Sequence, residues 1–185
     1  LKFLADRGWQ CFSLTDSPRN GEDAGRRLCI TFDDGYRSVY EHAVPALSEA
    51  GASATIYVVA DTIGGINEWD RRHGDSEEPM MTAAQLRELA DLGFIIGSHT
   101  LTHPHLPQLY DAHLHRELRD SRSKLEDIIG RPVMAFSYPY GDFDDRVLQA
   151  VMDAGYTSAT STRLGVVTAK TDRFAIPRVN VRWNA

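Results

Sequence analysis

Short apolar runs alternate along this chain with stretches in which apolar residues recur at helical spacing. The runs are 28–32 (LCITF), 54–60 (ATIYVVA), 94–96 (FII), 133–137 (VMAFS), 156–159 (YTSA) and 174–181 (FAIPRVNV). Short runs that are apolar or β-branched on both faces predict buried strands of a parallel sheet. Pro177 lies in the last run and has no N–H to donate, so this strand is expected at an edge or an end of the sheet.

The stretches between these runs predict helices. They cover 36–50, 82–92, 108–129 and 145–154, and a glycine follows the first three at 51, 93 and 130. Strands that alternate with helices predict an α/β domain with a parallel sheet, open or closed into a barrel. The segment from Gly64 to Pro79 is rich in glycine and charge, and we expect it to be the one long loop.

Length and composition fit a single domain over residues 1–185. Truncation at one or both ends is compatible with this prediction. A chain of 185 residues buries enough surface to fold without disulfides or a structural metal, so any metal site is free to be catalytic. The net charge of -6, with no Lys/Arg-rich run, argues against a nucleic-acid partner. No apolar run approaches the roughly 20 residues of a membrane helix, so no transmembrane segment is expected.

Two further features concern the compartment. The chain starts at Leu1 without a signal-peptide pattern, so we interpret it as a mature or trimmed fragment. Its sequence does not indicate the native compartment. Cys11 and Cys29 are the two cysteines, and they form no CxxC pair or metal-ligand spacing. We expect both to be buried small apolar residues, in preference to a disulfide.

Asp33 and Asp34 follow the first apolar run directly and precede Gly35. Adjacent carboxylates in a strand-to-helix turn repel each other unless a cation or a shared proton compensates. The alternative is that one of them simply caps the following helix. The pair is therefore a candidate for metal binding or proton transfer.

A second cluster follows the third run. His99, His103 and His105 lie within seven residues, in a chain with seven histidines in all. If 99–103 forms a helical turn, the i, i+4 spacing puts His99 and His103 on one face, where they can share a metal. One carboxylate from the aspartate pair would complete a set typical of hydrolytic metal sites, with open positions. The alternative is a pair of surface histidines beside Pro104.

The third cluster is FSYPYGD (136–142), again at the end of a run. Pro139 and Gly141 bracket Tyr140, so that a main-chain N–H and an aromatic wall could face a ligand, although a plain turn is the alternative. Ligands of α/β domains bind where the strands end. We therefore expect the three clusters to converge at one edge of the sheet.

TFDDGY (31–36), SHTLTH (98–103) and SYPYG (137–141), in this order, resemble the first three motifs of the NodB-type polysaccharide deacetylases, also called carbohydrate esterase family four. The resemblance covers roughly residues 28–181. It implies an irregular (β/α) barrel with about seven parallel strands. It also implies one divalent metal, zinc first, with cobalt, nickel or manganese as alternatives.

Carried over by position, the resemblance assigns Asp34, His99 and His103 to the metal, Asp33 to the general base and the Tyr140 N–H to the oxyanion. It implies removal of N-acetyl groups from an N-acetylhexosamine glycan in an extracellular, periplasmic or cell-envelope setting. An O-acetyl esterase on xylan or a similar glycan is the nearest alternative. A non-catalytic glycan-binding domain and a two-metal phosphoesterase are further ones. The oligomeric state is left open.

The chain departs from the family pattern in two places. The third motif lacks the arginine that pairs with the base in the family pattern. Arg178 is our candidate replacement, and the alternative is that Arg178 is an ordinary surface arginine. No histidine follows His115, so the family's late acid histidine is missing from this sequence. Either the chain stops short of that motif, or the acid comes from elsewhere, with His105 and protonated Asp33 as candidates.

Two residues are expected at the substrate besides Tyr140. Pro139 is assigned to substrate binding with the third motif. Trp69 lies in the long loop and is assigned to stacking on a sugar ring, with core packing as the alternative.

Overall fold

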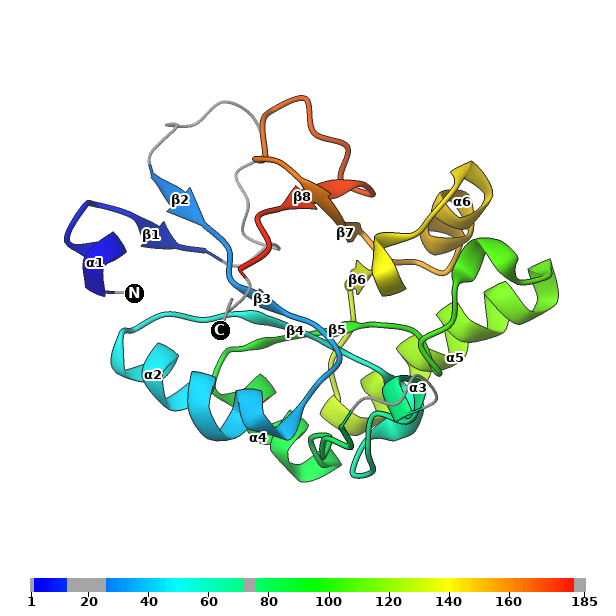
Figure 1. The fold of residues 1–185 in the computed structure, drawn as a ribbon, viewed down its shortest axis with the longest axis horizontal. Helices are drawn as coiled ribbons and strands as arrows, with labels where there is room; N and C mark the ends of the chain where they lie inside the picture. The colour runs from blue at the N-terminus through cyan, green and yellow to red at the C-terminus, as the bar shows by residue number, and fades with distance from the viewer. Residues whose placement is uncertain (1, 13–25, 72–75, 182–185) are drawn as a thin grey trace.

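The computed structural model describes residues 2–12, 26–71 and 76–181. Its main feature is a fully parallel sheet of six strands, ordered in space as they are along the chain. The strands are β3 (Thr31–Phe32), β4 (Thr55–Val58), β5 (Ile95–Ser98), β6 (Ala135–Ser137), β7 (Ser158–Leu164) and β8 (Ile176–Arg178). The sheet curls into half a barrel (Figure 1). The α/β class with a barrel-like parallel sheet is therefore confirmed, with six strands in this sheet where the resemblance implied about seven.

The longer helices connect successive strands of this sheet. They are α2 (Val44–Glu49), α4 (Ala83–Asp91), α5 (Asp111–Ile129) and α6 (Asp145–Asp153). In Figure 1, α2 and α4 lie on one side of β3, β4 and β5, with α5 beside them. Helix α4 packs against α5, and α5 against α6. This arrangement leaves the ends of the strands as the place where loops from several elements meet.

Helix ends follow local sequence signals. Thr82 and Gln85 form a reciprocal capping box at the start of α4. The Asp144 side chain accepts the Val147 N–H at 2.8 Å at the start of α6. Gly130 ends α5 with a φ of 66°, a left-handed conformation that glycine adopts without a steric penalty.

The predicted regular helix over 36–50 is wrong in its first half. Val39–Ala43 form a π-helix, which passes directly into α2. Pro45 lies at the start of α2 and has no N–H to donate to the preceding turn. A wider turn before the proline accommodates the missing hydrogen bond.

Two short strands were not predicted. β1 (Gln10–Cys11) pairs in parallel with β2 (Arg27–Leu28) in a separate sheet. The run 28–32 is therefore divided between β2 and β3. Cys11 is half-buried and Cys29 is exposed, so the prediction that both are buried is wrong. They belong to this outlying sheet and its connection rather than to the core, and no disulfide joins them.

Strand and loop bounds also differ from the prediction. The last predicted strand shortens to β8, which lies at the edge of the sheet, as Pro177 requires. β7 continues beyond 159, to Leu164. The expected long loop contains a helical turn, α3 (Glu68–Arg71).

The main core fills the space between the sheet and its helices. Its fully buried members come from strands and helices alike and include Ile56, Leu86, Leu118, Phe136 and Val151. A second small cluster joins Trp69 of α3 to Val59 and Met80. Among the described residues, no helix is both long and apolar enough to cross a membrane.

Candidate metal centre and active site

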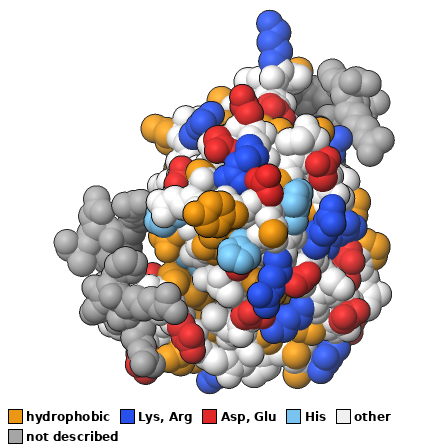
Figure 2. All heavy atoms as spheres, turned by 90° about the vertical axis from the view of Figure 1, so that its right-hand side faces the viewer, with side chains coloured by type: hydrophobic (Ala, Val, Ile, Leu, Met, Phe, Trp, Pro, Cys, Tyr) orange, Lys and Arg blue, Asp and Glu red, His pale blue; other side chains and the backbone are white. Residues whose placement is uncertain are grey.

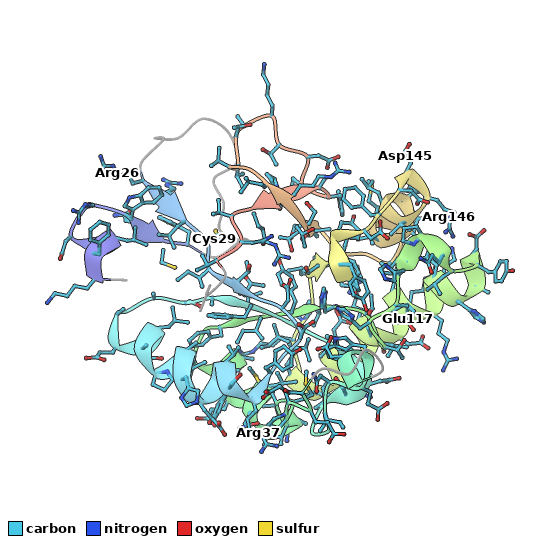
Figure 3. The ribbon with its side chains drawn as sticks, viewed as in Figure 1. Arg26, Cys29, Arg37, Glu117, Asp145 and Arg146 are labelled. Carbon is cyan, nitrogen blue, oxygen red and sulfur yellow. The ribbon has the colours of Figure 1, made fainter. Side chains whose placement is uncertain are left out.

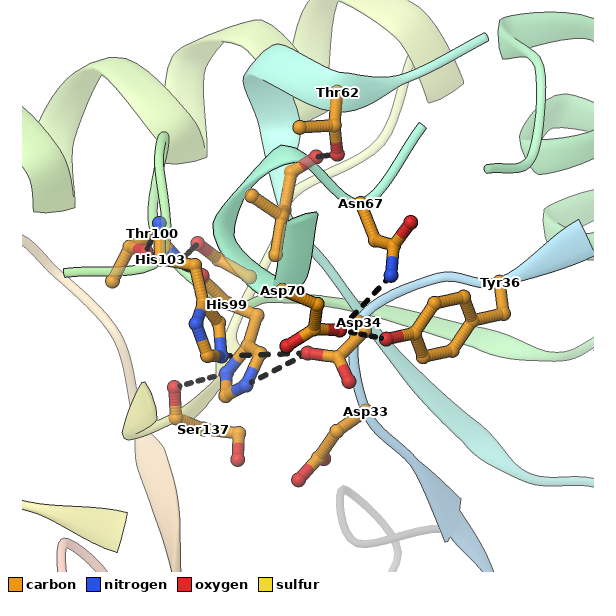
Figure 4. A network of polar contacts seen from close by, with 12 residues as sticks. Asp33, Asp34, Tyr36, Thr62, Asn67, Asp70, His99, Thr100, His103 and Ser137 are labelled. Carbon is orange, nitrogen blue, oxygen red and sulfur yellow. Dashed lines mark hydrogen bonds and ion pairs between the residues drawn. The ribbon is translucent and has the colours of Figure 1, made fainter. Parts of the chain in front are cut away.

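The three sequence clusters converge at the ends of neighbouring strands. Asp33 and Asp34 follow β3, His99 follows β5, and the Ser137 carbonyl closes β6 beside it (Figure 4). The same end of the sheet faces the viewer in Figure 2. Histidine and apolar side chains lie together there, with acidic and basic side chains around them.

Asp34, His99 and His103 form a compact group of ligand atoms. Asp34 Oδ1 lies 3.5 Å from His99 Nε2 and 3.4 Å from His103 Nε2. The three ligand atoms all lie within 4.8 Å of one another. In the described part of the chain, the buried Asp34 Oδ1 has no hydrogen-bond partner. A buried carboxylate oxygen without a hydrogen bond, facing two imidazole nitrogens, fits a cation held among them.

The protonation states of Asp34 and His103 near neutral pH are those that metal ligands need. Burial raises the pKa of the Asp34 carboxyl to about 6; the charge of His99 opposes this rise, and the Asp33 and Asp70 carboxylates add to it. Burial, with the charge of His99, lowers the pKa of His103 to about 3. His103 is therefore neutral near pH 7, as a metal ligand must be.

The ring of His99 is fixed by the third motif. His99 Nδ1 lies 2.7 Å from the Ser137 carbonyl oxygen, which can only accept a hydrogen bond. Nδ1 therefore carries a proton, and Nε2, 3.5 Å from Asp34 Oδ1, is the ring nitrogen left for a metal. This is the usual way in which an outer hydrogen bond orients a metal-ligating histidine.

The stretch 99–103 is not a helical turn, so the condition for i, i+4 spacing of the two histidines is not met. Thr100 and His103 have φ values of 71° and 61°, in the left-handed region. Instead, the Thr100 hydroxyl accepts the His103 N–H at 3.0 Å. The loop brings the two imidazoles together without helical spacing.

Glu117 on α5 holds this loop from below, and sequence reasoning did not find it. Its Oε2 accepts the N–H groups of Leu101 at 2.8 Å and Thr102 at 3.0 Å. Its Oε1 accepts the Thr102 hydroxyl at 2.8 Å. Figure 3 shows Glu117 on the helix beside the site. No sequence signal marks it, because a glutamate on an amphipathic helix normally faces solvent.

Asp33 stands outside the ligand group and pairs with Arg178. Arg178 Nη1 donates to Asp33 Oδ1 and Nη2 to Oδ2, each at 2.7 Å. Arg178 Nε donates to the Ser161 carbonyl at 2.9 Å, which fixes the guanidinium plane. Burial raises the pKa of Asp33, but the hydrogen bonds and charge of Arg178, with the charge of His99, outweigh it and hold the pKa below its usual value.

The third motif forms a wall of the site. Pro139 is buried, and Tyr140 is 44% exposed with a φ of 61°. The Tyr140 ring meets the His103 ring edge-on, with 4.6 Å between the ring centroids, and stacks on the His105 ring, with 4.0 Å between the centroids. His105 Nδ1 lies 3.4 Å from Asp142 Oδ2.

Backbone strain is concentrated in these loops. Among the described residues, the non-glycine positions with positive φ are Asp34, Thr100, His103 and Tyr140. All four belong to the three motifs. Strain of this kind persists where the surrounding structure holds a functional arrangement in place.

Trp69 is 8% exposed, and its ring stacks on the His103 ring with 4.7 Å between the ring centroids. Its other neighbours are Val59 and Met80 in the small core cluster. A ring this covered has little face to offer a sugar, so the structure favours the core-packing alternative. Asp70, the next residue, was missed; its Oδ2 accepts the Tyr36 hydroxyl at 2.8 Å.

Comparisons of the sequence connect this chain to known proteins. The sequence pattern of the family described as polysaccharide deacetylase matches residues 20–159. YxkH of Bacillus subtilis (strain 168), whose name places it in that family, is 29% identical over 185 residues, which are 98% of this chain and 62% of YxkH. The poly-beta-1,6-N-acetyl-D-glucosamine N-deacetylase of Staphylococcus aureus (strain N315) is 24% identical over 176 residues, 90% of this chain and 58% of that protein. The chain thus spans 62% and 58% of the lengths of these two relatives.

Solved structures share the fold. The Streptococcus pyogenes deacetylase PplD in complex with acetate has a TM-score of 0.81 at 23% identity, over 97% of this chain and 77% of PplD. The polysaccharide deacetylase BC0361 from Bacillus cereus has a TM-score of 0.79 at 28% identity, over 96% of this chain and 54% of BC0361. The curled parallel sheet is thus common to all three structures.

Proposed function

Because this chain belongs to the polysaccharide deacetylase family, we propose that it is a metal-dependent hydrolase that removes N-acetyl groups from a glycan containing N-acetylhexosamine. The observation that carries the proposal is the ligand group of Asp34, His99 and His103 beside the paired Asp33. A non-catalytic glycan-binding domain has no use for a carboxylate held next to such a group.

Asp34, His99 and His103 would hold one divalent ion, with zinc as our first choice and cobalt, nickel or manganese as alternatives. Their mixed nitrogen and oxygen donors suit each of these metals. When bound, the ion supplies a Lewis acid that polarises the acetyl carbonyl and acidifies a water molecule.

Asp33 acts as the general base in this proposal. It stays ionised at neutral pH, since its pKa is held below the usual range for a carboxyl group. A carboxylate beside the ligand group can accept the proton of the attacking water. Arg178 is a positioning residue, because its two Nη atoms fix both oxygens of Asp33.

The Tyr140 N–H is our candidate donor to the oxyanion, and Pro139 and the Tyr140 ring form the wall against which the acetylated sugar lies. The left-handed backbone at Tyr140 sets the direction of its peptide groups. A backbone N–H held rigidly toward developing negative charge is an effective catalytic donor.

The departing amine needs a proton, and two candidates are retained. His105 lies behind the Tyr140 ring and beside Asp142. Asp33 can return the proton that it received from water. Unchanged turnover in His105→Gln would exclude His105 as the donor and leave Asp33.

We propose an N-acetyl substrate over an O-acetyl one because an S. aureus relative is named as an N-acetyl-D-glucosamine polymer deacetylase. O-acetyl xylan remains the alternative. A two-metal phosphoesterase would need a second set of ligands, and the described residues contain one group of this kind. The proposal includes action in an extracellular, periplasmic or cell-envelope setting, which the family resemblance implies.

The test is hydrolysis by protein loaded with one equivalent of zinc. Acetylated chito-oligosaccharides, O-acetyl xylan and a phosphate ester are offered separately, and free amine, acetate and phosphate are measured. We expect free amine and acetate in equal amounts from the first substrate, with activity lost on chelation. Acetate from xylan alone, phosphate release, or no turnover at all would contradict the proposed function.

A further inference from the structure

Asp70 lies beside the candidate metal ligands, and the proposed function gives it no part in the reaction. It follows Trp69 on α3, and the Trp69 ring stacks on His103 at 4.7 Å. In Figure 4 the Asp70 carboxylate lies next to Asp34, on the side away from Asp33. Asp70 is also one of the two carboxylates whose charge raises the pKa of Asp34, which agrees with its place beside that group.

The Asp70 carboxylate is held in one orientation. The Tyr36 hydroxyl donates to Asp70 Oδ2 at 2.8 Å, and Asn67 Nδ2 donates to the same oxygen at 3.0 Å. Asn67 is 2% exposed, and it also donates to the Ser76 carbonyl at 3.1 Å and accepts the Glu78 N–H at 2.6 Å. Both of these bonds from described residues end on Oδ2, so within the part of the chain that the structure describes Oδ1 is the oxygen left for a substrate.

Asp33 and Asp70 flank the ligand group from opposite sides and belong to separate networks. Asp33 is tied to Arg178 on β8, whereas Asp70 is tied to Tyr36 and Asn67. Water attacks a carbonyl carbon perpendicular to the plane of the amide, and the nitrogen lies in that plane beside the carbonyl oxygen. Arg178 donates to both oxygens of Asp33, so Asp70 Oδ1 is the better placed carboxylate oxygen to accept from the N–H of an acetamido group at the ligand group.

We propose that Asp70 accepts a hydrogen bond from the N–H of the substrate's acetamido group and thereby selects N-acetyl over O-acetyl substrates. The inference rests on the proposed function and names the determinant of its bond specificity. An O-acetyl ester has an oxygen at this position, which has no hydrogen to donate and is repelled by a carboxylate. A site built to receive an N–H discriminates strongly against an analogue that lacks it.

Asp70→Asn tests this with little change in shape. The donors Tyr36 and Asn67 retain the carbonyl oxygen of the new amide, so its NH2 group takes the place of Oδ1. This puts a donor opposite the substrate N–H. The kcat/KM for N-acetyl substrate should fall by about 10- to 100-fold, the scale for a lost hydrogen bond to a charged group. The kcat/KM for an O-acetyl ester should hold or rise, because its bridging oxygen can accept from the new NH2.

Glu68→Gln is the matched control, since it makes the same chemical change at an exposed position on the same short helix. It should leave the ratio of the two kcat/KM values unchanged. If Asp70 only anchors Tyr36 and Asn67, Asp70→Asn will lower both values by the same factor or neither, and the inference is overturned. A wild-type protein that hydrolyses esters but not amides would overturn it as well. If the wild type hydrolyses neither, the proposed function itself fails, and this inference fails with it.

Binding gives a readout that is independent of turnover. In an Asp33→Asn background, which removes the base, calorimetry with an acetylated chito-oligosaccharide should show weaker binding when Asp70→Asn is added. Equal affinity with and without Asp70→Asn would contradict a hydrogen bond to the bound acetamido group.

Discussion

Arg178 Nη2 lies 2.7 Å from Asp33 Oδ2, although 145 residues separate the two along the chain. With the Nη1 bond to Oδ1, this makes a bidentate pair in which the arginine comes from β8, at the edge of the sheet. The third motif, which lacks an arginine, does not have to supply the cation for Asp33. The edge strand therefore contributes directly to the candidate active site.

Arg178→Lys should lower turnover by about 10-fold or more, because an ammonium cannot replace two parallel hydrogen bonds. Arg178 helps to hold the pKa of Asp33 low, so its loss raises that pKa. The base is ionised only above its pKa, and the acidic limb of the pH profile of kcat/KM should therefore move to higher pH. Arg163→Lys, at an exposed position on β7, is the control. An unchanged acidic limb in Arg178→Lys would rule out the positioning role.

Asp33→Asn should keep the metal and lose activity. Asp33 is not in the ligand group, so metal content should stay at one equivalent. Turnover should fall by about 100-fold or more, the usual scale for loss of a general base. The measurements are elemental analysis and deacetylation rate on one preparation. A fully active, metal-loaded variant would show that another group is the base.

Metal affinity should depend on pH through Asp34. Burial raises the pKa of this carboxyl to about 6, so below that pH a proton competes with the metal. His103, whose pKa burial lowers to about 3, does not compete in this range. The affinity should be nearly constant above pH 7 and fall by about tenfold per pH unit well below 6. Calorimetric titration with zinc between pH 5 and 8 measures this, and a flat affinity would contradict it.

Glu117→Gln should weaken metal binding without removing a ligand. The glutamate accepts three hydrogen bonds from the loop between His99 and His103. Loss of such an outer contact typically costs about 10- to 100-fold in metal affinity. The absorption spectrum of the cobalt-loaded protein should change as well. Glu126→Gln, on the same helix and bonded to the Val133 N–H at 2.9 Å, is the control. Equal effects in both variants would mean that only the fold is affected.

The family and the sheet could be predicted from sequence because their signals are local. Six apolar runs correspond to the six strands of the sheet, and the match over residues 20–159 confirms the resemblance carried by three motifs. The π-helix before Pro45 was missed, because helical spacing of apolar residues does not distinguish a wider turn from a regular one. The roles of the site residues stay predictions.

Long-range contacts explain what the sequence did not reveal. Glu117 and Asp70 reach the site only because α5 and α3 pack beside the loops that follow β5 and β3, and a single charged residue carries no sign of such packing. Trp69 shows the same limit: its stacking on His103 and its packing against Val59 and Met80 depend on long-range contacts that the sequence does not mark. Cys29 was misplaced because the run 28–32 divides between two sheets.

The most direct test is the metal content of the purified wild-type protein and of His99→Ala after zinc loading and removal of excess ion. We expect one tightly held equivalent per chain in the wild type and none in the variant. His99 Nε2 is one of three ligand atoms within 4.8 Å of one another, and the remaining two cannot hold the ion tightly. One equivalent retained in His99→Ala, or none in the wild type, would contradict the assignment of Asp34, His99 and His103 as the metal centre.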